Sequence, residues 1–132
     1  MNDANVKLVR DFYAAFDRGD IATVIATLTP DVEWGGNGRA KDYPLFGMRK
    51  GQAAVQKFFQ ELVELEDITE FSPRDFLADG DKVVVLGNYG GKIRKTGRPF
   101  STDWAHVFTI RDGKIARFVD FLDTAQFVEA SR

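Results

Sequence analysis

Apolar residues recur every three to four positions in three segments of the first half of the chain, which is the spacing of amphipathic helices. The first helix is predicted over residues 3–18, the second opens at Asp20 and is closed by Pro30, and the third opens at Gly51. Their apolar stripes contain Val6, Val9, Phe12, Tyr13 and Phe16, then Ile21, Val24, Ile25 and Leu28, then Val55, Phe58, Phe59, Leu62, Val63 and Leu65. A short last helix is predicted after Asp123 or Thr124, to about residue 129.

The other segments have the composition and the turn signals of strands. A short strand over residues 31–34 precedes the third helix, and strands over 68–78, 82–94 and 100–122 follow it. Pro73 interrupts the first of these, which indicates an edge strand or a bulge. Helices followed by a meander of strands are an α+β order. We therefore predict one domain, residues 1–132, in which a strongly curved antiparallel sheet wraps three helices and leaves a pocket.

Residues 35–50 form a long connection between the first strand and the third helix. Connections of this length without secondary structure are uncommon unless they are functional or mobile. Tyr43, Leu45 and Phe46 are unusual on a loop that faces only solvent. We expect this loop to form a flap over a pocket.

The last two strands carry the only histidine, His106, and an aspartate, Asp120, among residues that resemble a core. A two-residue turn at Asp112-Gly113 would place the two side chains on opposite faces of the sheet. A three-residue turn over 111–113 would pair His106 with Phe118 and make His106 and Asp120 diagonal neighbours on one face. The three-residue turn gives one face that is more cleanly apolar and leaves Ile115 on the opposite, mixed face, so we predict this register.

Composition excludes several classes of function. The chain has no cysteine, which removes disulfides, thiolate catalysis and cysteine zinc sites. A formal charge of −2 without a basic tract argues against nucleic acid as a partner. One histidine without clustered carboxylates does not indicate a metal site. The sequence has no glycine-rich loop between a strand and a helix, so it gives no sign of nucleotide binding, and no cofactor is expected. The polar start Met1-Asn2-Asp3 and the lack of a long apolar run predict no signal peptide, no membrane span and a cytoplasmic protein.

Several short motifs in this order resemble one family. They are residues 12–20 (FYAAFDRGD), 31–34 (DVEW), 51–55 (GQAAV), 80–85 (GDKVVV), 96–99 (TGRP), 106–108 (HVF) and 112–115 (DGKI). Over nearly its whole length the chain resembles the SnoaL-like polyketide cyclases, which are related to the ketosteroid isomerases within the NTF2-like superfamily. The resemblance implies a cone-shaped (cystatin-like) fold, three N-terminal helices inside a curved sheet, and a short C-terminal helix.

The resemblance also bears on the site. Ketosteroid isomerases use a first-strand aspartate, a first-helix tyrosine and a second acid, and the matching positions here are Trp34, Phe12 (with Tyr13 one step away) and Ala105. That set is absent. In SnoaL-type cyclases a histidine and an aspartate on the last two strands line the pocket, and the aspartate acts as base. His106 and Asp120 match these two positions.

These residues suggest general acid–base catalysis on a hydrophobic carbonyl compound, of the isomerase, cyclase or lyase type. Asp120 would be the base, and His106 its hydrogen-bonding partner or a donor to the enolate oxygen. The walls that bind the substrate would be Tyr13, Trp34, Trp104, Phe108 and Phe118. The non-catalytic alternative is that His106 and Asp120 form a buried polar pair that fixes the strand register.

Two further functions stay open: a non-catalytic binding module for a small hydrophobic metabolite, and a structural dimerisation domain. The resemblance implies a homodimer through the convex face of the sheet. The mixed face that carries Val107, Val119 and Phe121 would suit such a contact.

Overall fold

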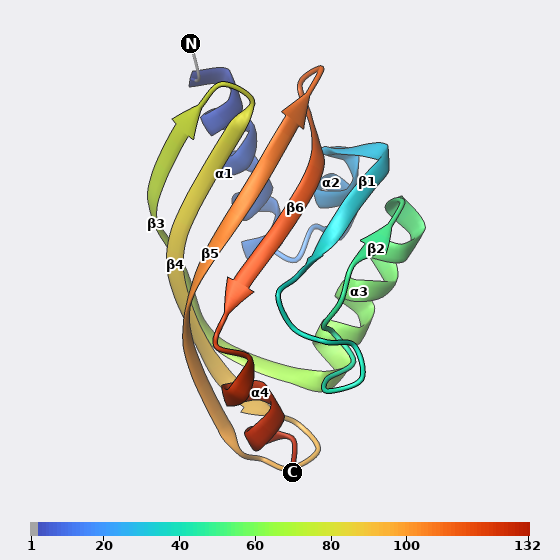
Figure 1. The fold of residues 1–132 in the computed structure, drawn as a ribbon, viewed down its shortest axis with the longest axis vertical. Coiled ribbons are helices and arrows are strands. Elements are labelled where there is room, and N and C mark those ends of the chain that lie inside the picture. Colours follow the sequence, from blue (N-terminus) through green and yellow to red (C-terminus); the bar gives the residue numbers. More distant parts are fainter. Residues whose placement is uncertain (1–2) are drawn as a thin grey trace.

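Six strands form one curved sheet, and the first three helices pack against its concave side (Figure 1). The computed structural model describes residues 3–132. The helices are α1 (Asp3–Asp17), α2 (Ile21–Ala26), α3 (Gln52–Leu65) and α4 (Thr124–Ala130). The strands are β1 (Leu28–Gly36), β2 (Arg49–Lys50), β3 (Glu66–Asp79), β4 (Lys82–Ile93), β5 (Pro99–Arg111) and β6 (Lys114–Leu122). Their order in the sheet is β2-β1-β6-β5-β4-β3, and the predicted α+β class is confirmed.

The first strand is longer than predicted and pairs with β6 in parallel, whereas β3, β4, β5 and β6 form the expected antiparallel meander. The second helix ends at Ala26 rather than at Pro30, which lies inside β1. Pro30 is tolerated there because the β1–β6 register shifts between Leu28 and Glu33, so this stretch is not a regular ladder. Pro73 lies at a second register shift, in the edge strand β3, as its position in the sequence predicts.

The predicted register of the β5–β6 hairpin is wrong. The turn holds only Asp112 and Gly113, with φ of 52° and 75°, and Arg111 pairs with Lys114. Two left-handed residues in succession are the conformation of a type I′ turn, whose twist matches that of the strands. Neither of the two registers considered from the sequence is observed, because the pairing shifts by one residue just beyond the turn.

That shift is a bulge at Ala116. Ile110 pairs with Ile115, but the next pair is Thr109 with Arg117, so Ala116 is the extra residue on β6. The two-residue turn pairs Ile115 with Ile110 and buries it fully, although the sequence placed it on the mixed face. From Arg117 onward every side chain of β6 is displaced by one position relative to an unbulged two-residue hairpin.

Beyond the bulge, His106 lies directly opposite Asp120. The prediction that the two side chains share a face is therefore confirmed, and the predicted diagonal arrangement is wrong. The inner face of β5 is continuous, with alternate residues buried: Phe100, Thr102, Trp104, His106, Phe108 and Ile110.

Gly87 of β4 allows one aromatic ring to lie flat against this inner face. Gly87 pairs with Trp104, and a Cβ atom at residue 87 would collide with the indole ring and with the carbonyl oxygen of Ser72. The indole stacks on the imidazole of His106, with ring centroids 3.8 Å apart. A missing side chain on β4 thus makes room for the ring that supports His106.

The loop over residues 37–48 connects β1 to β2 and packs against α4. Tyr43, Leu45 and Phe46 are buried, and the rings of Tyr43 and Phe46 pack on Phe127 of α4. The expectation that these side chains do not face solvent is confirmed. Movement of the loop as a flap stays a prediction.

None of the helices within residues 3–132 has the length and apolar character needed to cross a membrane. Met1 and Asn2 of the polar start lie outside the described residues. Asp123 caps α4 by accepting a hydrogen bond from the amide of Ala125, which confirms one of the two predicted caps.

Candidate active site

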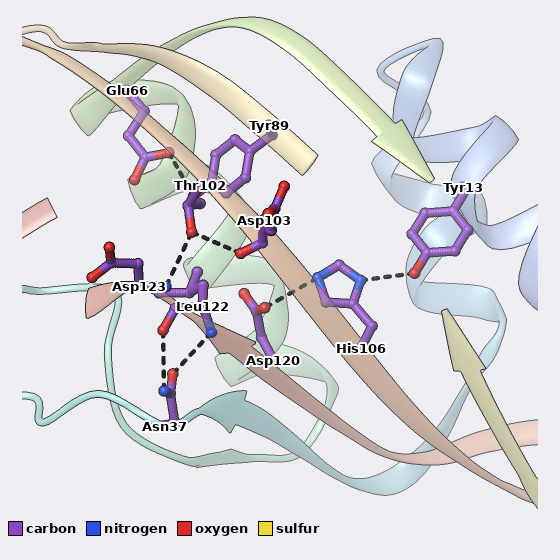
Figure 2. A network of polar contacts seen from close by, with 10 residues as sticks. All are labelled: Tyr13, Asn37, Glu66, Tyr89, Thr102, Asp103, His106, Asp120, Leu122 and Asp123. Carbon is purple, nitrogen blue, oxygen red and sulfur yellow. Dashed lines mark hydrogen bonds and ion pairs between the residues drawn. The ribbon is translucent and has the colours of Figure 1, made fainter. Parts of the chain in front are cut away.

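Three polar side chains from three elements form a row inside the cone, joined by one hydrogen bond and one ion-pair contact (Figure 2). Tyr13 of α1 places its hydroxyl oxygen 2.7 Å from Nδ1 of His106. On the other side of the imidazole ring, Nε2 lies 3.2 Å from Oδ1 of Asp120. His106 is only 5% exposed, so both of its nitrogen atoms depend on these two neighbours.

The environment of Tyr13 determines which nitrogen of His106 carries a proton. Burial, together with the negative charge of Asp120, raises the pKa of the Tyr13 phenol well above its ordinary value. The phenol therefore keeps its proton and donates it to Nδ1 of His106. Nε2 then carries the imidazole proton and faces Asp120.

Asp120 is only partly engaged by His106. The Nε2–Oδ1 contact is within ion-pair distance but does not have the alignment of a hydrogen bond, so buried Oδ1 lacks a partner of good geometry. Among residues 3–132 no hydrogen bond holds Oδ2 either, and the side chain is 24% exposed. The carboxylate is held in place by its neighbour and keeps lone pairs free.

A second polar cluster lies at the other side of Asp120 and was not predicted. Glu66, the first residue of β3, is 2% exposed. Its Oε2 accepts a hydrogen bond of 2.6 Å from the hydroxyl of Tyr43, and its Oε1 accepts one of 3.3 Å from Tyr89. Burial, reinforced by the charge of Asp120, raises the pKa of Glu66 to about 7, against the opposing effect of the two tyrosine hydrogen bonds.

Two adjoining hollows, of about 60 and 40 Å³, separate these clusters. Tyr13 and His106 line the larger hollow, and Tyr43 and Glu66 line the smaller. Six residues line both: Trp34, Phe58, Leu62, Tyr89, Phe118 and Asp120. Asp120 therefore stands where the two hollows meet, among walls that are mainly aromatic.

Trp34 contributes an unsatisfied hydrogen-bond donor to this region. Its ring stacks on Phe118 with centroids 4.1 Å apart, and the residue is 2% exposed. The indole nitrogen Nε1 is buried and has no partner. A buried donor without an acceptor costs about 1–3 kcal/mol, which an acceptor atom of a ligand would recover.

A family profile described as a SnoaL-like domain matches residues 9–118. The chain belongs to the SnoaL-like family. Its fold is that of the NTF2-like proteins, as the sequence motifs predict.

Solved structures and a curated relative agree with this assignment. An NTF2-like protein from Burkholderia xenovorans is 33% identical, with 98% of this chain and 96% of that one covered and a TM-score of 0.88. TerC, co-crystallised with polyporic acid, is 32% identical over 97% and 98% of the two chains, with a TM-score of 0.86. An uncharacterized protein of Mycobacterium tuberculosis is 29% identical over 91% of this chain and 89% of its own length.

The SnoaL-like chain brings together five of the seven residues proposed from its sequence. Asp120, His106, Tyr13, Trp34 and Phe118 all line the hollows. Trp104 and Phe108 line neither of them. Trp104 lies behind His106 as a stacked support, and Phe108 packs beneath Tyr13 with ring centroids 5.8 Å apart.

Sequence reasoning missed the Glu66 cluster. Glu66 follows the apolar stripe of α3 directly and precedes Asp67, so it resembles the solvated end of a helix. One signal was available, because Tyr43 stands among apolar residues in a long loop. All three tyrosines of the chain, Tyr13, Tyr43 and Tyr89, are buried, and each one contacts a titratable group of the site.

Within residues 3–132, no three histidine or carboxylate side chains come together as ligands. The chemistry available to the described site is proton transfer between carboxyl, imidazole and phenol groups.

The proton arrangement predicts one tautomer for His106. Long-range 1H–15N correlation spectra of the neutral imidazole should show a protonated Nε2 and an unprotonated Nδ1. His106 is the only histidine, so the assignment is unambiguous. Tyr13→Phe should move the Nδ1 resonance, because it removes the donor, and leave Nε2 protonated. A proton on Nδ1 in the wild type would contradict the proposed row.

The environment of Glu66 predicts a cost to stability at high pH. From about pH 4.5, the ordinary pKa, to about 7, the unfolded chain ionises Glu66 while the folded chain keeps the proton. The contribution of Glu66 to the free energy of unfolding therefore falls as pH rises through this window, by at most about 3 kcal/mol. Glu66→Gln, which stays neutral, should gain stability relative to wild type over the same window in urea unfolding.

The matched control for this measurement is Glu64→Gln, which makes the same change at an exposed position of α3. Its stability difference from wild type should not change appreciably between pH 4.5 and 8. Parallel pH profiles for wild type and Glu66→Gln would show that Glu66 ionises normally in the folded protein.

Proposed function

We propose that this protein catalyses proton transfer on a hydrophobic carbonyl compound without a cofactor, as an isomerase, cyclase or lyase. The observation that carries the proposal is the position of Asp120. Its carboxylate has free lone pairs, stands at the junction of two aromatic-walled hollows, and is supported by the Tyr13–His106 row.

In this mechanism Asp120 removes a proton from the carbon next to the carbonyl group. His106 orients the carboxylate through Nε2, and Tyr13 holds the imidazole ring through Nδ1. Tyr13 donates its proton to His106, and His106 directs its own N–H toward Asp120. Neither residue therefore has a free donor for the enolate oxygen. Trp34 lines the same hollows as Asp120, and its indole N–H has no partner, so it is one candidate donor to that oxygen.

The size of the hollows sets a condition on the substrate. Sites for small organic ligands usually measure about 300–1,000 Å³, far more than the 60 and 40 Å³ present here. In our proposal the middle of the 37–48 loop retreats, and Tyr43 and Phe46 leave the smaller hollow. Its ends stay fixed, since the Asn37 amide bonds to Leu122 and the Arg49 guanidinium bonds to Glu61.

The rival proposal is a non-catalytic module that binds a hydrophobic metabolite in the same place. TerC was co-crystallised with polyporic acid, and we propose an organic ligand of comparable apolar character for this chain. The unsatisfied donor of Trp34 supports binding and catalysis equally. The free carboxylate of Asp120 favours catalysis, because a pocket that only binds an apolar ligand gains nothing from a buried negative charge.

Exchange of α-protons tests the proposal without knowledge of the natural substrate. Wild-type protein should accelerate the exchange of the α-protons of 2-tetralone, a bicyclic ketone, in D₂O, followed by ¹H NMR. Asp120→Asn should slow the catalysed exchange by about 10²-fold or more, because it removes the general base.

Asp103→Asn is the matched control, since Asp103 lies three residues before His106 on the exposed face of β5. It should exchange at the wild-type rate. Equal rates for wild type and Asp120→Asn would overturn the catalytic proposal, and binding without any catalysed exchange would favour the rival.

We also propose a homodimer through the outer face of the sheet. Two adjacent rows of apolar side chains cross this face: Leu77, Val84, Val107 and Val119, then Leu86, Ala105 and Phe121. Leu77, Leu86 and Phe121 are 54%, 41% and 46% exposed, and such a continuous apolar patch suits an isologous contact.

A cytoplasmic location stays a prediction.

Sedimentation velocity tests the dimer. Wild type should sediment as a dimer, and Phe121→Asp should sediment as a monomer because it places a charge in the patch. Val63→Asp, a control at an exposed apolar residue of α3, should remain dimeric. A monomeric wild type at micromolar concentration would refute the proposal.

A further inference from the structure

We propose that Glu66 is a second catalytic residue: it is the acid that hydrogen-bonds and protonates the carbonyl oxygen of the substrate, opposite the base Asp120. This inference rests on the proposed function and assigns the other half of the proton transfer. It identifies the substrate as a compound whose carbonyl oxygen enters the smaller hollow while its α-carbon stays beside Asp120.

Burial without a cation sets Glu66 apart from an ordinary structural carboxylate. Within residues 3–132 no lysine or arginine lies within ion-pair distance of it, and its hydrogen-bond partners are the neutral phenols of Tyr43 and Tyr89. A buried carboxylate that lacks a cation tends to take up a proton. Glu66 thus lies where its protonated form is favoured and where it has no positive charge to neutralise.

Position makes that proton useful. Glu66 and Asp120 line the same hollow, and Tyr89 lines both hollows. Figure 2 shows Glu66 and Tyr89 on one side of Asp120 and His106 with Tyr13 on the other. A ketone between the two carboxyl groups therefore has a base at its α-carbon and an acid at its oxygen.

The proton balance closes without a co-reactant. Asp120 takes the α-proton as the C–H bond breaks, and Glu66 gives its proton to the oxygen as the O–H bond of the enol forms. The carboxylate left on Glu66 accepts a hydrogen bond from Tyr89, which lies on β4 and keeps its place when the loop retreats. In the reverse sense the enol returns its proton to Glu66, and Asp120 protonates carbon at the old or at a conjugated position.

The surroundings separate the two acids in the way this chemistry needs. Titratable groups that face Glu66 are Tyr43 from the loop, Tyr89 from β4 and Asp120 from β6. The nearby pair Asp67 and Arg94 lies outside, with both side chains at least half exposed. Burial and the charge of Asp120 raise the pKa of Glu66 to about 7, so a large share of it is protonated at neutral pH.

Binding of 2-tetralone as a function of pH tests this role. The ketone oxygen only accepts hydrogen bonds, so its affinity should be highest when Glu66 is protonated. The dissociation constant, measured by isothermal titration calorimetry from pH 5.5 to 8.5, should rise about tenfold with an inflection near pH 7. Glu66→Gln, whose amide donates at every pH, should bind without this inflection, and Glu64→Gln should keep it.

Two further variants should move the inflection in opposite directions. Tyr89→Phe removes a hydrogen bond that lowers the pKa of Glu66, so the inflection should move to higher pH. Asp120→Asn removes a charge that raises it, so the inflection should move to lower pH. A purely structural Glu66 would not change the affinity for a ketone in this pattern.

These outcomes separate the two proposals. A dissociation constant that does not depend on pH, or an absence of binding, overturns the assignment of Glu66 while α-proton exchange by Asp120 is judged on its own assay. Inflected binding with no catalysed exchange overturns the catalytic function and leaves Glu66 as a donor in a binding site. Inflected binding, together with exchange that Glu66→Gln slows at pH 6 and Glu64→Gln does not, supports both.

Discussion

The direct pairing of His106 with Asp120 is the constraint on which the site depends, and a single extra residue creates it. Without the bulge at Ala116, a two-residue turn would put Ala105 opposite Asp120 and turn the carboxylate to the outer face. The two-residue turn pairs Ile110 with Ile115 and places both in the core, with or without the bulge. The bulge that follows this pair then turns Asp120 to the same inner face, so the apolar pair near the turn and the polar pair farther along the strands can both face inward.

That register would be costly if the polar groups it buries lacked partners. Tyr13 satisfies one nitrogen of His106, and Asp120 approaches the other. Trp104 stacks on the ring because Gly87 leaves space for the indole. The helix α1 therefore does more than fill the cone, since its tyrosine fixes the imidazole whose other nitrogen supports Asp120. Packing and chemistry use the same side chains here.

The sequence allowed the faces to be predicted but not the bulge. Strict alternation from Phe100 to Ile110 defines the inner face of β5, and it places His106 there without any knowledge of pairing. Ala116 has no such signal, because a small apolar residue fits a regular strand and a bulge equally well. Pro30 misled for a related reason: proline ends helices, but it also fits an irregular stretch of strand.

The burial of Glu66 could not be predicted from the local sequence pattern. Its burial comes from Tyr43 and Tyr89, which are 23 residues away on either side, and no periodicity near Glu66 reports contacts at that distance. The SnoaL-like family was identifiable because it rests on many short motifs in a fixed order, whereas a site residue rests on a few long-range contacts.

The two carboxyl groups of the interior, Asp120 and Glu66, have different neighbours. Asp120 stands beside the imidazole of His106 and is partly exposed. Glu66 stands beside two phenols, has no cation, and feels the charge of Asp120. The charge of an ionised Asp120 raises the pKa of Glu66, so Glu66 is a weaker acid while that charge is present. In the proposed mechanism, transfer of the substrate's α-proton to Asp120 removes that charge, which lowers the cost of releasing the proton of Glu66. The electrostatic coupling would then link removal of the α-proton to protonation of the oxygen, through two side chains that lie on the first and the last strand of the meander.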